Sequence, residues 1–172
     1  LPKYVQLMAE LMTARIKYLV EESNFFNSDW LVKEELISLD KFSAMFGIYG
    51  LAEAVNILMK RAGEPGTYGH SAAADDLGYL ITTKIAELVA KIEMPYCEGN
   101  SGRAFMHSQS GIDLDLEVTA GTRIPIGTEP DLFHHLKTVA RHHHLFASGI
   151  SDVLSFDETA VNNPQAVVDL SL

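Results

Sequence analysis

The sequence is short of cysteine, of basic residues and of long hydrophobic runs. A single cysteine, Cys97, cannot form an internal disulfide, and alone it cannot build a thiolate metal site. Only 13 lysines and arginines stand against 23 acidic residues, and the formal net charge of -10 argues against binding to nucleic acid or an anionic membrane surface. No stretch approaches the ~20 apolar residues that cross a bilayer. We therefore expect a soluble protein of the cytoplasm, with neither nucleic acid nor membrane as a partner.

The composition is that of a globular protein. Among 172 residues, 47% are hydrophobic and 21% are charged, which suffices for one core of domain size. The chain starts at Leu1 without an initiator methionine, and residues 164–168 near its other end still read as the opening of a helix. These features predict that residues 1–172 are a single segment of a larger domain, cut at both ends.

Helical and strand-like patterns alternate along the chain. Apolar residues at steps of three and four predict helices, and short apolar runs next to glycine predict strands. The expected helices are 3–22, 30–37, 51–62, 71–92, 129–140 and one from 164 onward, and the expected strands are 42–46, 103–107 and 150–156. The first helix carries additional apolar residues that should let it pack on two neighbours. This alternation predicts an α/β fold with a largely parallel sheet.

A long glycine-rich loop at 108–128 follows the second predicted strand. Ligands collect at the carboxyl ends of parallel strands, and a loop of this length is usually functional. His107, Ser108, Gln109 and Arg123 are therefore the candidate substrate-binding residues. The alternative is a polar surface loop held by its own hydrogen bonds.

Other residues carry weaker signals. Asp113 and Asp115 alternate and could hold a divalent ion, but the full calcium-loop spacing is absent and a solvated acidic turn is favoured. Five histidines crowd one helix end, where neighbours point apart, so we expect an exposed or partner-facing surface and no metal site; they are His134, His135, His142, His143 and His144. Cys97 is only a weak catalytic candidate, since no neighbour activates its thiol, and a structural role is favoured.

Four sequence blocks together resemble the glycyl-radical enzymes. These blocks are 41–54, 107–111, 122–127 and 162–168, and they resemble most closely the YjjI-type group of that superfamily. The pyruvate formate-lyase and anaerobic ribonucleotide reductase branches are similar more loosely. The resemblance implies a partial ten-stranded α/β barrel in a homodimer. It also implies a glycyl radical installed by a radical-SAM activase under anaerobic conditions, and a thiyl cysteine that abstracts hydrogen from a small organic substrate.

Two departures from the family pattern concern the radical residues. No arginine of this chain is followed by valine, so the Arg-Val-x-Gly-Tyr radical loop is absent, and Cys97 follows the Gly-x-x-Gly-Leu turn that the family's radical cysteine precedes. No catalytic residue carries over. The expectation is an enzyme fragment that lines a pocket, binds no cofactor itself and is inactive alone. The alternatives are a noncatalytic binding or scaffold module, and a metal-dependent hydrolase using Asp113 and Asp115.

Overall fold

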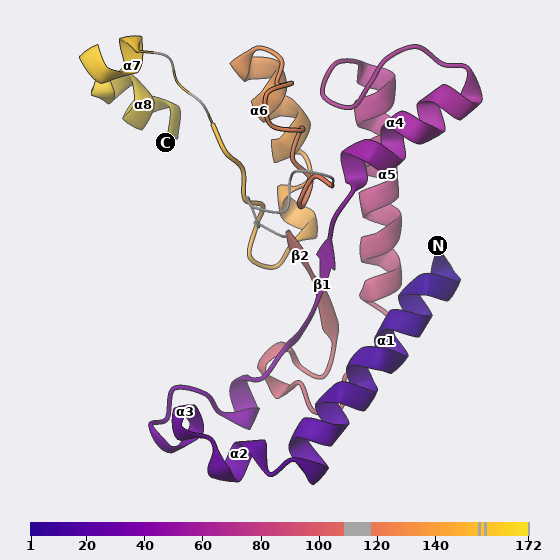
Figure 1. Cartoon of the computed structure of the whole chain (residues 1–172), viewed down its shortest axis with the longest axis vertical. Coiled ribbons are helices and arrows are strands. Elements are labelled where there is room, and N and C mark those ends of the chain that lie inside the picture. Colours follow the sequence, from indigo (N-terminus) through magenta and orange to yellow (C-terminus); the bar gives the residue numbers. More distant parts are fainter. Residues whose placement is uncertain (109–117, 155, 157, 172) are drawn as a thin grey trace.

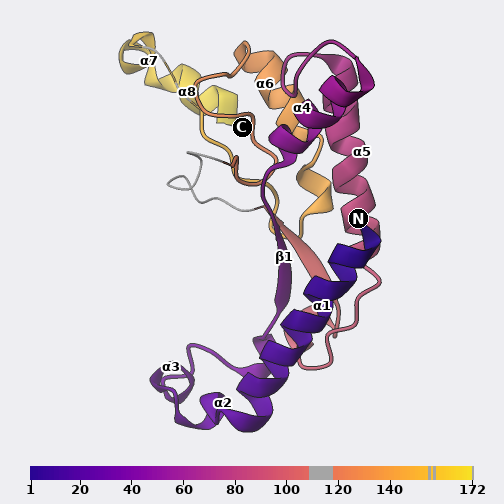
Figure 2. The same cartoon turned by 45° about the vertical axis from the view of Figure 1, so that its right-hand side comes forward.

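The computed structural model describes residues 1–108, 118–154, 156 and 158–171. Two strands run through the middle of an elongated molecule, and helices lie at both of their ends and along one side (Figure 1). Figure 2 shows the same body turned by 45°, and in both views α7 and α8 stand apart from the rest.

Most described elements follow the predicted order: α4 has the predicted bounds, other helices are shorter, each strand begins one or two residues later, and α2 was not predicted. The helices are α1 (Pro2–Lys17), α2 (Phe25–Ser28), α3 (Trp30–Lys33), α4 (Leu51–Ala62), α5 (Ala72–Val89), α6 (Leu132–Ala140), α7 (Thr159–Asn162) and α8 (Pro164–Ser171), and the strands are β1 (Ala44–Ile48) and β2 (Ala104–Ser108). Single turns of other helix types occupy Tyr18–Glu22, Leu39–Lys41, Glu98–Asn100 and His143–Leu145. Pro2 occupies the first turn of α1, where its missing N–H costs nothing.

The two strands pair in parallel. Their register runs from Ala44 opposite Ala104 to Ile48 opposite Ser108, and α4 and α5 make the connection that a parallel pair requires. Side chains alternate between the two faces of the sheet. The residues of the buried face are Ala44, Phe46, Ile48, Ala104, Met106 and Ser108, whereas those of the other face are exposed or half-buried.

Packing of α4 and α5 on the strands fixes the upper half of the molecule. Gly50, with φ of 76°, lets the chain turn directly from β1 into α4. Gly78 on α5 lets the ring of Tyr68 lie flat on the helix, because a Cβ there would approach that ring to 2.6 Å. The Ser71 side chain accepts a hydrogen bond from the Ala74 N–H and begins α5.

The prediction of a partial ten-stranded α/β barrel is wrong for this structure. The described residues form one sheet of two parallel strands, and helices make up most of the ordered elements. The third predicted strand, 150–156, is not found: residues 150–154 and 156 form no strand. Asp152 in this segment binds His135 instead of presenting a regular edge to the sheet. The run also contains polar residues such as Ser151 and Asp152, so its apolar residues alone were a poor guide to a strand.

Helix length bears on the membrane question. Among the helices that the structure describes, none is both long enough and apolar enough to cross a bilayer.

Candidate functional site at the carboxyl ends of the strands

The last residues of both strands lie side by side. Gly47 and Ile48 of β1 are opposite His107 and Ser108 of β2, so the two carboxyl ends meet at one edge of the sheet. This is the position at which parallel sheets collect ligands. The fold therefore places two predicted binding residues where the sequence expected them.

Residues 119–123 return to this same edge and are anchored there by hydrogen bonds. The Gly121 N–H donates to the Ile48 carbonyl over 2.9 Å, and the Gly50 N–H donates to the Thr119 carbonyl over 2.8 Å. The Glu53 carboxylate in the first turn of α4 accepts the Thr119 N–H at 3.0 Å and the Thr119 hydroxyl at 2.6 Å. One carboxylate oxygen thus fixes the end of the glycine-rich segment to the start of α4.

The structure places Ser108 and Arg123 at this edge in buried positions, whereas His107 lies on the other face of the sheet. Ser108 is 3% exposed, and in the described part of the chain its hydroxyl has no hydrogen-bond partner. Arg123 is 2% exposed, and its Nε donates to the Ala120 carbonyl over 3.3 Å. His107 alternates with Ser108 and is half-buried on the other face of the sheet. Gln109 lies outside the described residues, as do Asp113 and Asp115.

Cys97 lies at the opposite end of the strands. It is fully buried in the loop that precedes β2, where its carbonyl accepts the Gly102 N–H over 2.9 Å. The Gly99 N–H in the same loop donates to the Phe42 carbonyl just before β1. Burial raises the pKa of the Cys97 thiol, which disfavours the thiolate form that acts as a nucleophile. Cys97 and Ser108 are separated by the length of β2.

A buried polar cluster beside the strand ends was missed by sequence reasoning. The Tyr68 hydroxyl donates to the Thr122 carbonyl over 2.8 Å and lies 3.2 Å from Nε2 of His142. Because the single hydroxyl proton is used on the carbonyl, His142 must donate from Nε2. Burial raises the pKa of Tyr68, and burial together with the Arg141 charge lowers the pKa of His142 to about 4. Both side chains are therefore neutral near pH 7, and they support Thr122 beside Arg123.

Asp75 of α5 joins three elements near the same end. Its carboxylate accepts the Gly69 N–H at 2.7 Å and the Thr138 hydroxyl at 2.9 Å, and it lies 3.0 Å from Nε2 of His134. This one buried carboxylate holds the 67–70 turn, α5 and α6 together. The Asp75 side chain, which is 6% exposed, can be buried because these groups hydrogen-bond to its carboxylate.

The expectation that the histidine cluster forms an exposed surface is wrong for two members. His135 is 4% exposed and lies 2.7 Å from a carboxylate oxygen of Asp152, and His142 is 0% exposed. Their two-turn spacing on one helical face, shared with buried Val139, was the available signal. No group of three or more potential metal ligands converges within the residues that the structure describes.

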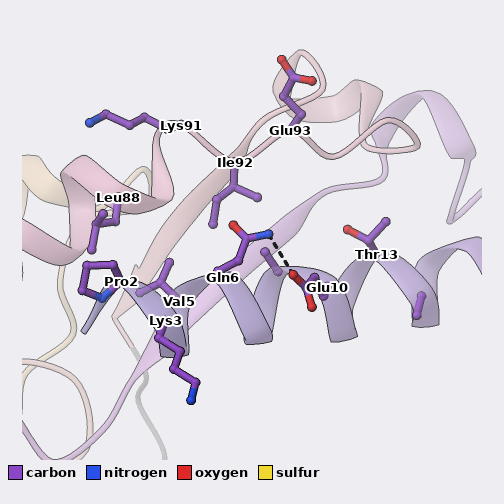
Figure 3. Close-up of a pocket in the computed structure, with 12 residues that line it drawn as sticks. Pro2, Lys3, Val5, Gln6, Glu10, Thr13, Leu88, Lys91, Ile92 and Glu93 are labelled. Atoms are coloured by element: carbon purple, nitrogen blue, oxygen red, sulfur yellow. Dashed lines mark hydrogen bonds between the residues drawn. The ribbon is translucent and has the colours of Figure 1, made fainter.

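Two hollows open elsewhere on the surface. One of 380 Å³ lies between the start of α5 and α6, and its lining includes Asp75 and His134. Another of 790 Å³ lies between α1 and the end of α5 (Figure 3), with Val5 and Ile92 in its wall and Lys3 at its side. Neither is lined by Ser108 or Arg123, so neither is the cavity that the sequence predicted.

Comparison with known proteins decides the family. A family model described as "Glycyl radical enzyme YjjI-like" matches residues 1–171. The chain belongs to this family. Its resemblance to the YjjI-type group, inferred from four short blocks, is thereby confirmed over nearly the whole sequence.

Two curated relatives are much longer than this YjjI-like chain. "Uncharacterized protein YjjI" of Escherichia coli (strain K12) is 48% identical over 172 residues, which are 100% of this chain and 33% of the relative. An "Uncharacterized protein" of Haemophilus influenzae (strain ATCC 51907 / DSM 11121 / KW20 / Rd) is 39% identical over 173 residues, covering 99% of this chain and 34% of the relative. The chain thus spans about a third of these proteins. No solved structure matches it.

Proposed function

We propose that this chain is the substrate-binding segment of a YjjI-like glycyl-radical enzyme. Residues 1–172 would form one segment of a larger domain in a cytoplasmic protein, and a small organic molecule would bind at the carboxyl ends of β1 and β2. Family membership supports the class of enzyme, and the length of the relatives supports the role as a segment.

The observation that carries the proposed site is the buried hydroxyl of Ser108. Its environment excludes water, and it lacks a hydrogen-bond partner in the described part of the chain. An unpaired buried polar group costs about 1–3 kcal/mol, which a bound ligand can recover by pairing with it. Ser108 is therefore proposed to contact the substrate, with His107, Gln109 and Arg123 as further contacts.

The chain's own residues would bind and orient the substrate. The hydrogen bonds of Glu53 and Ile48 to residues 119–121 keep these residues in place, and a fixed wall positions a ligand without reorganisation. The glycyl radical of the family would supply hydrogen abstraction. Neither radical residue is assigned to this chain, and Cys97 lies at the far end of β2, a strand's length away from this site.

The partners in this proposal are the small-molecule substrate, a radical-SAM activating enzyme and a second copy of the full-length protein. The test is electron paramagnetic resonance of the full-length protein after anaerobic incubation with its activase. A glycyl-radical doublet is expected. An intact, folded protein that gives no doublet would contradict the proposal and favour a noncatalytic binding or scaffold module.

A further inference from the structure

α1 carries two apolar faces, of which one is packed in the structure. Its inner face buries Val5, Ala9 and Ile16. At about 100° per residue, a second apolar face lies roughly opposite the first. This outer stripe comprises Tyr4, Leu7, Met8 and Leu11 of α1 and Tyr18 directly after it, whose exposed fractions are 71%, 57%, 47%, 52% and 56%. The sequence predicted that this helix packs on two neighbours, and its inner face contacts α5.

The spacing of the outer stripe is that of a helix–helix seam. Tyr4, Leu7, Leu11, Ala14 and Tyr18 recur at steps of three, four, three and four, which is the spacing of the two core positions in a heptad repeat. Scattered exposed apolar residues are ordinary, but a continuous stripe marks an interaction surface. No other element lies on the outer side of α1 in either view (Figures 1 and 2).

Charges along one border of the stripe restrict its partner. Lys3, Glu10 and Lys17 are seven residues apart and occupy the position that flanks such a seam. In an antiparallel pairing with a second copy, Glu10 would approach its own counterpart, and Lys3 would approach Lys17. Like charges in these positions oppose this antiparallel pairing, whereas an acidic, a basic and an acidic residue along the border of another helix would complement Lys3, Glu10 and Lys17.

We propose that the outer stripe of α1 is covered by a helix of the same full-length polypeptide that lies outside residues 1–172. The relatives align with the whole of this chain, α1 included, and two thirds of their length lies outside the match, which provides ample sequence for such a helix. This inference rests on the proposal that residues 1–172 are a segment of a longer protein. It does not depend on radical chemistry.

Site-specific thiol labelling of the full-length protein tests the inference. Leu11→Cys on the seam and Gln6→Cys outside the seam and its charged border form a matched pair, since both positions are exposed in the 172-residue structure. Maleimide modification of each site is followed by mass spectrometry, at concentrations where sedimentation shows a monomer. We expect the Leu11→Cys thiol to react at least tenfold more slowly than the Gln6→Cys thiol.

Two results would overturn the inference. Equal labelling rates in the monomer would show that the stripe is open, and protection that disappears on dilution from dimer to monomer would assign it to a second copy. If Leu11→Cys does not fold, Tyr18→Cys with Gln6→Cys provides the same comparison. The labelling readout is independent of the radical doublet, so failure of one proposal leaves the other testable.

Discussion

The two ends of the two-stranded sheet differ in the kind of residue that they bury. The carboxyl end encloses Ser108, Thr122, Arg123 and His142, whereas the amino end encloses the thiol of Cys97 among backbone hydrogen bonds. Burying polar groups costs free energy unless partners or ligands satisfy them. The amino end also buries the side-chain amide of Asn100, which has no hydrogen-bond partner among the described residues, so the two ends differ in the number of polar side chains that they bury. In our proposal the larger polar group, at the carboxyl end, faces the ligand.

The largest expected contrast between the ends is their response to acid. Because the folded-state pKa of His142 is about 4 and its ordinary value is 6.5, the unfolded chain binds the proton more readily between these values. Stability is therefore fully present above pH 6.5 and falls as the pH drops towards 4, by up to about 3 kcal/mol. Backbone amides around the Tyr68–Thr122 contact should lose protection from hydrogen exchange over this range, while those of the loop around Cys97 stay protected.

Substitution of His142 checks the origin of that response. His142→Gln keeps a side-chain N–H that can donate to Tyr68 but cannot take up a proton, so the loss of protection between pH 6.5 and 4 should become smaller. The matched control is His143→Gln, at the exposed neighbouring position, which should leave it unchanged. An unaltered pH response in His142→Gln would assign the acid sensitivity to another group.

The next effect is steric and belongs to the amino end. A Cβ added at Gly99 would lie 2.4 Å from the Lys41 carbonyl oxygen, and this backbone atom cannot rotate away. Gly99→Ala should destabilise the loop before β2 by about 2 kcal/mol. The change is measured as faster hydrogen exchange of the Gly102 amide.

A comparison glycine separates this clash from conformational strain. Gly63 has φ of 72° and nothing within 4 Å of an added Cβ, so Gly63→Ala should cost only about 1 kcal/mol. If Gly63→Ala and Gly99→Ala lowered stability equally, the loop of Gly99 before β2 would not be held against Lys41 before β1 as tightly as their contact indicates.

The smallest predicted effect is functional and belongs to the carboxyl end. Ser108→Ala removes one hydrogen-bonding hydroxyl, which is worth about 1 kcal/mol, or roughly a fivefold weaker affinity for the compound that the activated enzyme consumes. Cys97→Ala serves as the control at the other end and should leave that affinity unchanged. A greater loss of affinity in Cys97→Ala would reverse the functional assignment of the two ends.

Sequence periodicity predicted most elements of the fold but not their assembly. The helices over 51–62 and 71–92 and the strands near Ala44 and Ala104 were predictable, because apolar spacing and flanking glycines act locally. The predicted strand at 150–156 was wrong: residues 150–154 and 156 form no strand, and the contact of Asp152 with His135 in this run is not visible in local β-propensity. Strand number could not be derived, since it depends on partners distant in sequence.

For the candidate site, the sequence located the loop but not its supports. The placement of Ser108 at the carboxyl edge followed from strand direction, which a helical crossover dictates, whereas that of Arg123 depends on the hydrogen bonds that return residues 119–121 to this edge. The contact of Tyr68 with His142 joins residues 74 positions apart, and no spacing rule connects them. Burial of His135 and His142 could have been anticipated from their shared helical face, whereas their partners could not.

The central claim is that the carboxyl end of the sheet is the substrate side of a YjjI-like radical enzyme. The most direct measurement is the decay of the glycyl-radical signal of the activated full-length protein when small organic compounds are added anaerobically. We predict that a compound accelerates the decay in the wild type and in Cys97→Ala, and that Ser108→Ala needs roughly fivefold more of it for the same effect. A response that is intact in Ser108→Ala and lost in Cys97→Ala would contradict the claim.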